Sequence, residues 1–442
     1  MTTTKSEDTQ ELKMPLWKAN SWFVVLYLLF FIDMTDRYAL AATLPMIKAT
    51  YNLTDAQSGM LGTAFAVSIA FFVIPAGLLA HKWSRRKVCS IMVILWSIAT
   101  LGTGLAKGFI PLVAARFAVG VGEAGYAPVS YTLISTWYPK KMRATMMGWF
   151  YSASQVGATL GLMLAGWLAF TYGWKACFGI LTIPGLILGI FAWFMPDFKN
   201  KVDDQVKEIE QGGTTSVLKL GAKDAILYTL KSPAVLMTIL FSGGIALAGT
   251  TFTIWGVTLF VRSFGMNVKE AATFIGFIGI IAIIAPILFG RMADYLHKRN
   301  KKGRVLALVI LSVTFFLSML VLTQYALVAK NLVFAFITYG LCKATLASLM
   351  ATANTITQDL LPPYYRSISS SLIPIANQGL GGTIGPVLCG VFSDKFGIVM
   401  ALAYVSSIAF IALTAINLLI WKFFDRDNEK LERFGEFNLE RS

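Results

Sequence analysis

The sequence predicts an all-α polytopic membrane protein in which twelve transmembrane helices form two six-helix bundles. Three observations lead to this prediction. The 442-residue chain is 56% hydrophobic and only 14% charged, with a mean hydropathy of +0.66, which is too apolar for a soluble protein of this length. Its apolar residues gather in windows long enough to cross a bilayer. One long polar segment divides these windows into two equal sets.

Each predicted helix is a window of about 20 apolar residues, the length that spans the hydrocarbon core. In chain order the windows are 21–45, 56–80, 88–106, 110–136, 144–170, 174–195, 233–261, 269–292, 305–325, 332–358, 367–392 and 399–423. They define an N-terminal bundle, a middle loop and a C-terminal bundle between two polar tails, with boundaries at 1–20, 21–196, 197–232, 233–424 and 425–442. We expect the middle loop and both tails to be cytoplasmic.

The distribution of Lys and Arg predicts this orientation. Of the 38 basic residues, 28 fall on the side of the two termini, 7 fall on the other side and 3 lie within predicted helices. Cytoplasmic loops carry the excess of basic residues, so we expect both termini in the cytoplasm. We also expect the protein to lie in the cell (inner or plasma) membrane and to function as a monomer. The net charge of +15 is then a feature of the loops, and we expect a lipid bilayer rather than nucleic acid as the partner.

Several classes of function lack their motifs. The chain has no GxxxxGK[ST] loop for ATP and no HExxH pair for a metal, and its two histidines, His81 and His297, are far apart. Its four cysteines, at 89, 177, 342 and 389, show no CxxC spacing. We therefore expect neither an enzyme nor an ATP-driven pump, and no metal or cofactor. The proton gradient remains as the energy source.

Six ionisable residues fall where the bilayer should exclude them: Asp33, Asp36 and Arg37 in the first window, Arg116 and Glu123 in the fourth, and Lys343 in the tenth. Each costs at least about 2.5 kcal/mol unless it faces a cavity or a partner. Asp33 and Arg37 are four residues apart and could simply form an ion pair on one helix face. Arg116 and Glu123 are two turns apart, about 10 Å along the axis, so they line a path more easily than they pair.

The charges of these six residues sum to zero. Protonation of Asp36 and Glu123 would leave a charge of +2, and burial favours the protonated form of a carboxyl group. Our hypothesis is that proton entry exposes a cationic site for an anion, so that substrate and proton load together. Asp33 is the third candidate for proton coupling.

A loop motif occurs once in each half. Gly77-Leu-Leu-Ala-His81, followed by a basic run that contains Arg85, matches Gly290-Arg-Met-Ala-Asp294, followed by a second basic run. Parallel repeats of this kind are typical of transporters whose substrate site lies between the two halves.

Together with the two-half pattern and this loop motif, the membrane part of the chain resembles the major facilitator superfamily. Its N-terminal half is most similar to two branches, the anion:cation symporters that include sialin and galactonate transporters, and the Spinster-like transporters. The stretches that carry the resemblance are FIDMTDR, LTDAQSGMLGTAF, RFAVGVGEAGYAP, TWYPKKMRA, FYSASQ and GWKACF.

The resemblance to the anion:cation branch implies a role for several residues. Arg37 would bind the substrate's carboxylate, Asp36 and Glu123 would carry protons, Arg116 would be a gating partner and Gln155 a polar substrate contact. The loop motif departs from the family pattern, because His81 stands where the family has Asp and Ser84 where it has Gly, whereas Asp294 keeps the acid in the second copy.

Lys343 matches no motif of the family. A second cation suits a dianion or a bulky acid, and a salt bridge to an acid of the N-terminal half is equally compatible with the sequence. Asn354, Asn377 and Gln378 offer amide donors for a substrate, or hydrogen bonds between helices. Thr54 and Gln57 form the pattern of an N-terminal helix cap.

We therefore predict a secondary active transporter that carries a small organic anion (a carboxylate, sugar acid or sulfonate) together with protons by alternating access. The alternatives are a Spinster-like transporter of an amphiphilic lysolipid-type substrate, a proton-driven drug exporter, or a receptor built on the same scaffold. Drug exporters usually carry a GPxxGG-like stretch on the fifth helix, where this chain has GATLGLMLAGW.

Overall fold

The computed structural model describes residues 14–198, 227–362 and 372–439, and these ranges are helical without any strand. The helices of the N-terminal half are α1 (Leu16–Tyr51), α2 (Asp55–Lys82), α3 (Arg85–Leu105), α4 (Phe109–Glu123), α5 (Tyr126–Trp137), α6 (Lys140–Tyr172) and α7 (Trp174–Ala192). Those of the C-terminal half are α10 (Pro233–Phe264), α11 (Val268–Arg299), α12 (Gly303–Val321), η1 (Leu322–Ala326), α13 (Leu332–Asp359), α15 (Leu372–Ala376), η2 (Asn377–Gly382), α16 (Thr383–Phe396) and α17 (Ile398–Leu439). Most of the predicted middle loop lies outside the described residues.

The predicted all-α membrane fold is confirmed. Within the described ranges, ten segments are long and apolar enough to cross a membrane, with α4 and α5 counted as one. The segments formed by α1 and by α15, η2 and α16 supply the other two predicted spans.

Three predicted windows contain an irregular turn. The π-helical turn η1 lies at the end of the window 305–325, and the other two turns interrupt their windows near glycine and proline residues. The window 110–136 is broken between α4 and α5, directly after Glu123. Gly125 is a weak helix former, and Pro128 has no N–H to donate to the carbonyl of Ala124. The window 367–392 contains the π-helical turn η2, just before Pro386, which likewise lacks a donor. Both interruptions therefore follow from glycine and proline chemistry.

The last helix is longer than predicted. The sequence suggested a polar tail from residue 425, but α17 continues to Leu439. Asp427 explains part of this extension, because its Oδ2 accepts a hydrogen bond of 2.7 Å from the backbone N–H of Ala234 at the start of α10. A carboxylate at a helix N-terminus is favourable, so the two helices hold each other at this point.

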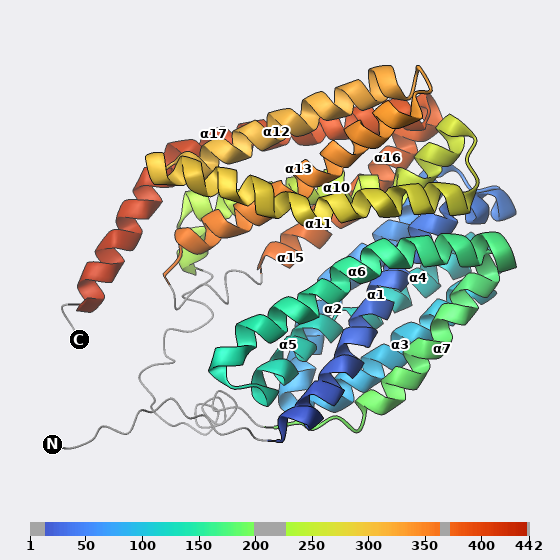
Figure 1. Ribbon diagram of the computed structural model, residues 1–442, viewed down its shortest axis with the longest axis horizontal. Coiled ribbons are helices and arrows are strands. Elements are labelled where there is room, and N and C mark those ends of the chain that lie inside the picture. The colour runs from blue at the N-terminus through green and yellow to red at the C-terminus, as the bar shows by residue number, and fades with distance from the viewer. Residues whose placement is uncertain (1–13, 199–226, 363–371, 440–442) are drawn as a thin grey trace.

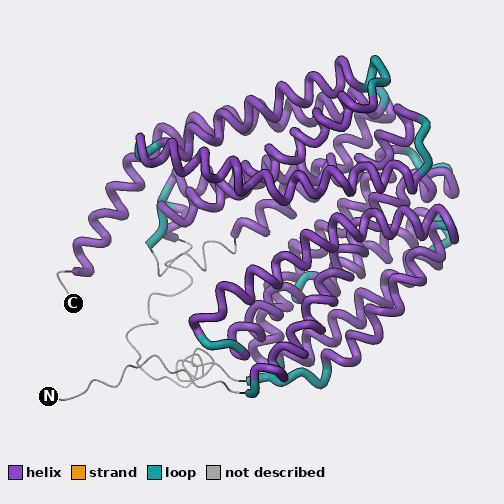
Figure 2. The backbone as a smooth tube through the Cα atoms, viewed as in Figure 1, coloured by secondary structure: helices purple, strands orange, loops and turns teal. Residues whose placement is uncertain are grey.

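The two halves form two separate bundles (Figure 1), α1 to α7 in blue to green and α10 to α17 in yellow-green to red. The loops gather at the two ends of these bundles (Figure 2). We call the end that holds the start of α1 and the end of α17 the terminal end, and the opposite end the distal end. The bundles approach each other at the distal end and diverge toward the terminal end (Figure 1).

The interface between the halves, which we call the seam, is formed by α2 against α16, α6 against α11 and α1 against α10. Glycines allow the closest approach. A Cβ atom on Gly59 of α2 would overlap the backbone of Pro386 and Val387 in α16, and one on Gly390 of α16 would overlap the backbone of Asp55. Toward the terminal end of α2, by contrast, a Cβ on Gly77 would have no neighbour within 4 Å. The seam is therefore closed at its distal part.

Candidate functional site

The five ionisable residues of the N-terminal half that the sequence singled out lie together between α1 and α4. Arg37 is the centre of the first set, because its Nε donates to Glu123 Oε2 at 2.6 Å and to Asp33 Oδ1 at 3.3 Å. The ion pair that the four-residue spacing of Asp33 and Arg37 allowed is thus present, and Glu123 adds a second carboxylate to it.

The second set is an ion pair between the same two helices. Arg116 Nη1 lies 3.6 Å from Asp36 Oδ2, and both side chains are only 1% exposed. Phe65 of α2 separates the two sets, since the guanidinium carbons of Arg37 and Arg116 each lie 5.3 Å from the centre of its ring. Arg116 and Glu123, on one face of α4, therefore bind different partners and do not pair with each other.

Exposure distinguishes Arg37 from its partners. Its side chain is 24% exposed, whereas those of Asp33 and Glu123 are 1% and 0% exposed. The guanidinium can therefore meet a molecule from outside the cluster, while the acids contact it from the buried side.

Both sets leave hydrogen-bonding capacity unused. Within the described residues, no hydrogen bond reaches either carboxylate oxygen of Asp36, Asp33 Oδ2, Glu123 Oε1 or Arg116 Nε and Nη1. Polar atoms this deeply buried are normally hydrogen-bonded. The cluster can thus accept protons or water molecules without breaking its existing hydrogen bonds.

Lys343 lies on α13 in the other half. Its Nζ donates to Thr253 Oγ1 of α10 at 3.0 Å, and it forms no ion pair with any residue that the structure describes. Thr253 lies beside Tyr38, the residue that follows Arg37 on α1. Lys343 is therefore near the seam, although it is not part of the N-terminal charge cluster.

Three of the four predicted amide ligands have clearly different surroundings. Asn377 of η2 packs within its own half, with its amide beside Met350 and Ser242, as expected for a hydrogen bond between helices. Asn354 on α13 has a buried Oδ1 without a partner in the described part of the chain. Gln155 of α6 is half-buried and forms no hydrogen bond with another described residue.

The repeated loop motif makes its described contacts inside each half. Arg85 donates to the carbonyl of Phe198 at 3.1 Å, and Arg304 bridges Asp294 and Asp359. Like Gly77, Gly290 has no close neighbour, and the side chain of His81 lies outside the described residues. In this conformation, the described part of the motif does not bind one half to the other.

The main ionic contact between the halves in the described part of the chain lies at the distal end, and it was not among the predicted sites. Arg262 at the end of α10 donates to both oxygens of Asp55, at 2.6 and 2.7 Å, and Lys48 pairs with the same carboxylate. Ser393 of α16 donates to Asp55 Oδ2 at 2.6 Å, while Asp394 accepts from the backbone N–H groups of Asp55 and Ala56 at 2.7 and 2.9 Å. We call these five residues (Lys48, Asp55, Arg262, Ser393 and Asp394) the distal latch.

A sequence signal for the latch existed in part. Asp55 follows the predicted cap residue Thr54, and the capping box with Gln57 is confirmed. Arg262 and Asp394 also lie at helix ends on the side that the basic residues assign to the outside. Which of these charges meet depends on the packing of α2 against α10 and α16, helices that are about 200 and 340 residues away along the chain.

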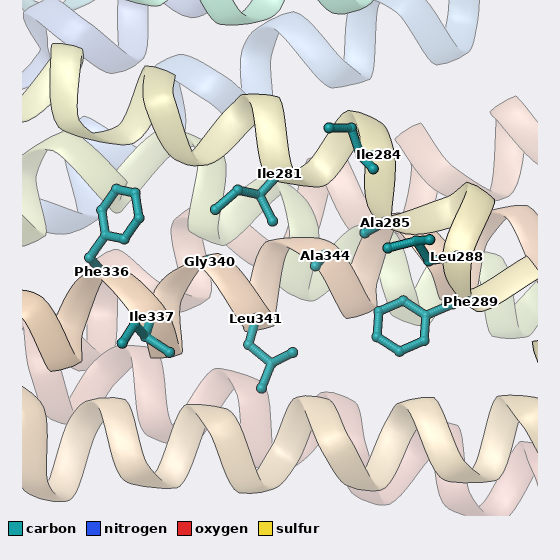
Figure 3. Close-up of a pocket in the computed structure, with 10 residues that line it drawn as sticks. All are labelled: Ile281, Ile284, Ala285, Leu288, Phe289, Phe336, Ile337, Gly340, Leu341 and Ala344. Atoms are coloured by element: carbon teal, nitrogen blue, oxygen red, sulfur yellow. The ribbon is translucent and has the colours of Figure 1, made fainter.

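A groove of about 410 Å³ lies elsewhere, between α11 and α13 (Figure 3). Its lining side chains are all apolar, among them Ile281, Phe289 and Phe336. In Figure 3 they line one face of α13, at 336, 337, 340, 341 and 344, and this face does not include Lys343. Its chemistry suits lipid chains rather than a charged solute.

Comparison with known proteins gives a consistent result. Residues 26–386 match the family model described as Major Facilitator Superfamily. The chain is 24% identical to a hexuronate transporter of Bacillus subtilis (strain 168), over 84% of this chain and 87% of that protein. It is 28% identical to a cis,cis-muconate transport protein of Acinetobacter baylyi, over 64% of this chain and 68% of that protein.

The fold also matches solved structures. A bacterial homolog to the human lysosomal transporter Spinster, in an inward-facing and unoccupied conformation, superposes with a TM-score of 0.79 at 21% identity, covering 93% of this chain and 98% of that one. The family model, which spans most of the chain, and the two-bundle fold lead to one conclusion: this protein belongs to the major facilitator superfamily.

Proposed function

We propose that the protein carries a small organic anion across the membrane together with protons, by alternating access of a site between its two halves. The observation that carries this proposal is the arrangement around Arg37, a partly exposed cation whose two carboxylate partners are buried behind it. The hexuronate and muconate transporters to which the chain is similar move organic acids, which supports the same substrate class.

Coupling follows from competition for one guanidinium. Arg37 Nε is bound by Glu123 at 2.6 Å, and an entering carboxylate needs donors of the same group. Protonation of Glu123 removes its negative charge, and with it the Coulomb attraction between the carboxylate and the guanidinium of Arg37. A proton on Glu123 therefore frees Arg37 for the substrate, and by linkage the substrate raises the affinity of the site for protons.

Asp36 and Arg116 provide the second proton site in this proposal. Their pair is fully buried at 3.6 Å, and the remaining donors and acceptors of both side chains are largely unused. An ion pair that is incompletely hydrogen-bonded in the interior gains little over its desolvation cost. A proton on Asp36 would release Arg116 to rotate, which makes it the gating partner.

In the proposed transport cycle, the distal latch is closed in one conformation and open in the other. If the termini are cytoplasmic, as the basic residues indicate, the closed distal end faces outside and the site opens to the cytoplasm. Opening to the outside must break the bidentate bond between Asp55 and Arg262 and remove Asp394 from the start of α2. The halves would then close at the terminal end, where the two copies of the loop motif lie.

Uptake into liposomes that contain the purified protein tests the proposal. A panel of labelled sugar acids, di-acids and sulfonates is offered with and without an inward proton gradient, and proton entry is followed with an internal pH dye. We expect Glu123→Gln to abolish uphill accumulation while anion exchange continues, because the variant mimics the protonated state. Glu429→Gln, an exposed position on α17, is the matched control and should behave as the wild type.

The alternatives give different results in the same assay. Accumulation that persists unchanged in Glu123→Gln would contradict the coupling role of this residue. Transport of lysolipid or of organic cations, but of no small anion, would replace the proposed substrate by one of the other two classes. Saturable binding without movement of any solute would indicate a receptor.

A further inference from the structure

Lys343 is a cation without a counter-ion among the residues that the structure describes. Its ammonium group has three donors, one of which is used by Thr253 at 3.0 Å, and no carboxylate of the described residues pairs with it. An unpaired ammonium group within a membrane-spanning helix is costly, and such groups generally face a water-filled cavity or a functional partner. The remaining donors of Lys343 are thus available to a ligand.

The position of Lys343 relates it to Arg37. Arg37 and Tyr38 are consecutive residues of α1, so they differ in depth by only about 1.5 Å. Tyr38 lies beside Thr253 of α10 and near Tyr339, one turn before Lys343 on α13. Arg37 and Lys343 therefore lie at similar depth near the seam, one in each half.

We propose that Lys343 is the second cation of the substrate site, and that the preferred substrate is an organic dianion whose two acidic groups are bound by Arg37 and by Lys343. This inference rests on the proposed function. The other possibility raised by the sequence, a salt bridge from Lys343 to an acid of the N-terminal half, is not formed in this conformation, because Arg37 and Arg116 occupy those acids.

The charges of the site suit such a substrate. With all acids ionised, Asp33, Asp36 and Glu123 exceed Arg37 and Arg116 by one negative charge, and Lys343 cancels it. Two protons would leave a charge of +2, which one dianion neutralises. The expected cycle therefore moves two protons with each dianion and transfers no net charge.

A dianion bound in this way would also connect the two halves. A monoanion on Arg37 contacts the N-terminal half alone, whereas a second acidic group on Lys343 attracts α13 toward α1. Binding energy that is available only when the halves approach each other favours closure of the seam around the loaded site. Discrimination between dianions and monoanions should therefore appear in transport as well as in binding.

Two matched pairs of probes test the inference: trans,trans-muconate against sorbate, and glucarate against gluconate. In each pair, one carboxylate is replaced by an uncharged carbon group at otherwise similar size. Affinities are measured calorimetrically at pH 5.5 in lipid nanodiscs for the wild type, Lys343→Gln and Lys343→Arg. Uptake of the bound dianion into liposomes, with and without an imposed membrane potential, measures the charge that is moved.

We expect the wild type to bind at least one dianion about tenfold to a hundredfold more tightly than its monoanionic partner, the usual range for a hydrogen bond between charged groups. Lys343→Gln should reduce this ratio to near one, because it weakens the binding of the dianion and changes the binding of the monoanion little. Lys343→Arg should restore much of the ratio. Dianion uptake should not respond to the membrane potential.

Other outcomes overturn the inference in distinguishable ways. If Lys343→Gln lowers the affinity for both members of a pair equally, or for neither, the lysine does not bind the second acidic group. If the wild type prefers the monoanions, the substrate class is wrong although organic-anion transport stands. If the wild type binds none of the four probes and moves no other organic anion, the proposed function itself has failed.

Discussion

The two ends of the molecule use the same kinds of charged residue for different purposes. At the distal end, Arg262 of one half binds Asp55 of the other, so the ion pair crosses the seam. At the terminal end, Arg304 binds Asp294 and Asp359, all within the C-terminal half. Ion pairs of the first kind stabilise one arrangement of the two halves, and pairs of the second kind stabilise a half in any arrangement. The conformation of this protein is therefore decided mainly at the distal end.

The largest effect is expected at the backbone contact beneath the latch. Gly59→Leu places a side chain where even a Cβ atom overlaps the backbone of Pro386, and a backbone cannot move aside as a flexible side chain can. Overpacking costs about 1–3 kcal/mol, which changes the balance between closed and open distal ends by roughly fivefold to more than a hundredfold. We expect loss of transport and a lasting separation of the halves at this end.

Spin labels at Lys107→Cys and Lys330→Cys measure that separation, because both positions are exposed in distal loops of opposite halves and the four native cysteines are buried. Gly179→Leu is the control, since a Cβ at this position has no neighbour within 4 Å. An unchanged distance between the labels in Gly59→Leu would mean that the contact between α2 and α16 does not hold the distal end closed.

A smaller effect is expected from the latch itself. Asp55→Asn removes the negative charge that Arg262 and Lys48 share, and Arg262→Gln removes the bidentate donor. Each change should shift the balance toward the open distal end by about 1 kcal/mol, less than the overlap at Gly59, because Lys48 and Arg262 are partly exposed to solvent. The two changes should not be additive, because they delete the same interaction. The same pair of spin labels reports the shift, and the double variant gives the coupling energy.

Arg304→Gln sharpens the comparison between the two ends. It breaks ion pairs of similar chemistry, but inside one half, so it should lower thermal stability by roughly 1 kcal/mol without changing the distance between the distal labels. A change of that distance similar to the one in Asp55→Asn would show that the two ends are not independent, which contradicts the division proposed here.

The two regions also differ in how far their contacts can be predicted from the sequence. The charged residues of α1 and α4 were conspicuous because a bilayer excludes them, and the structure brings all five together. Of their pairings, the sequence offered only that of Asp33 with Arg37. Glu123, which also binds Arg37, is the last residue of α4 before the break at Gly125, where the sequence predicts continuous helix. The distal latch was missed because each of its members is an ordinary charge at a helix end, and only the packing of α2 against α10 and α16 makes them partners.

The smallest effect on the distal distance is expected from the helix cap that precedes the latch. α2 and α11 begin with the same capping box, Thr54 with Gln57 in one half and Asn267 with Glu270 in the other. Thr54→Ala and Asn267→Ala should each cost about 1 kcal/mol of stability, measured by thermal unfolding. Only the first cap precedes backbone N–H groups that bind Asp394 across the seam. Thr54→Ala should therefore also widen the distal distance slightly, whereas Asn267→Ala should leave it unchanged, and equal behaviour of the two variants would mean that the start of α2 docks onto α16 without help from its cap.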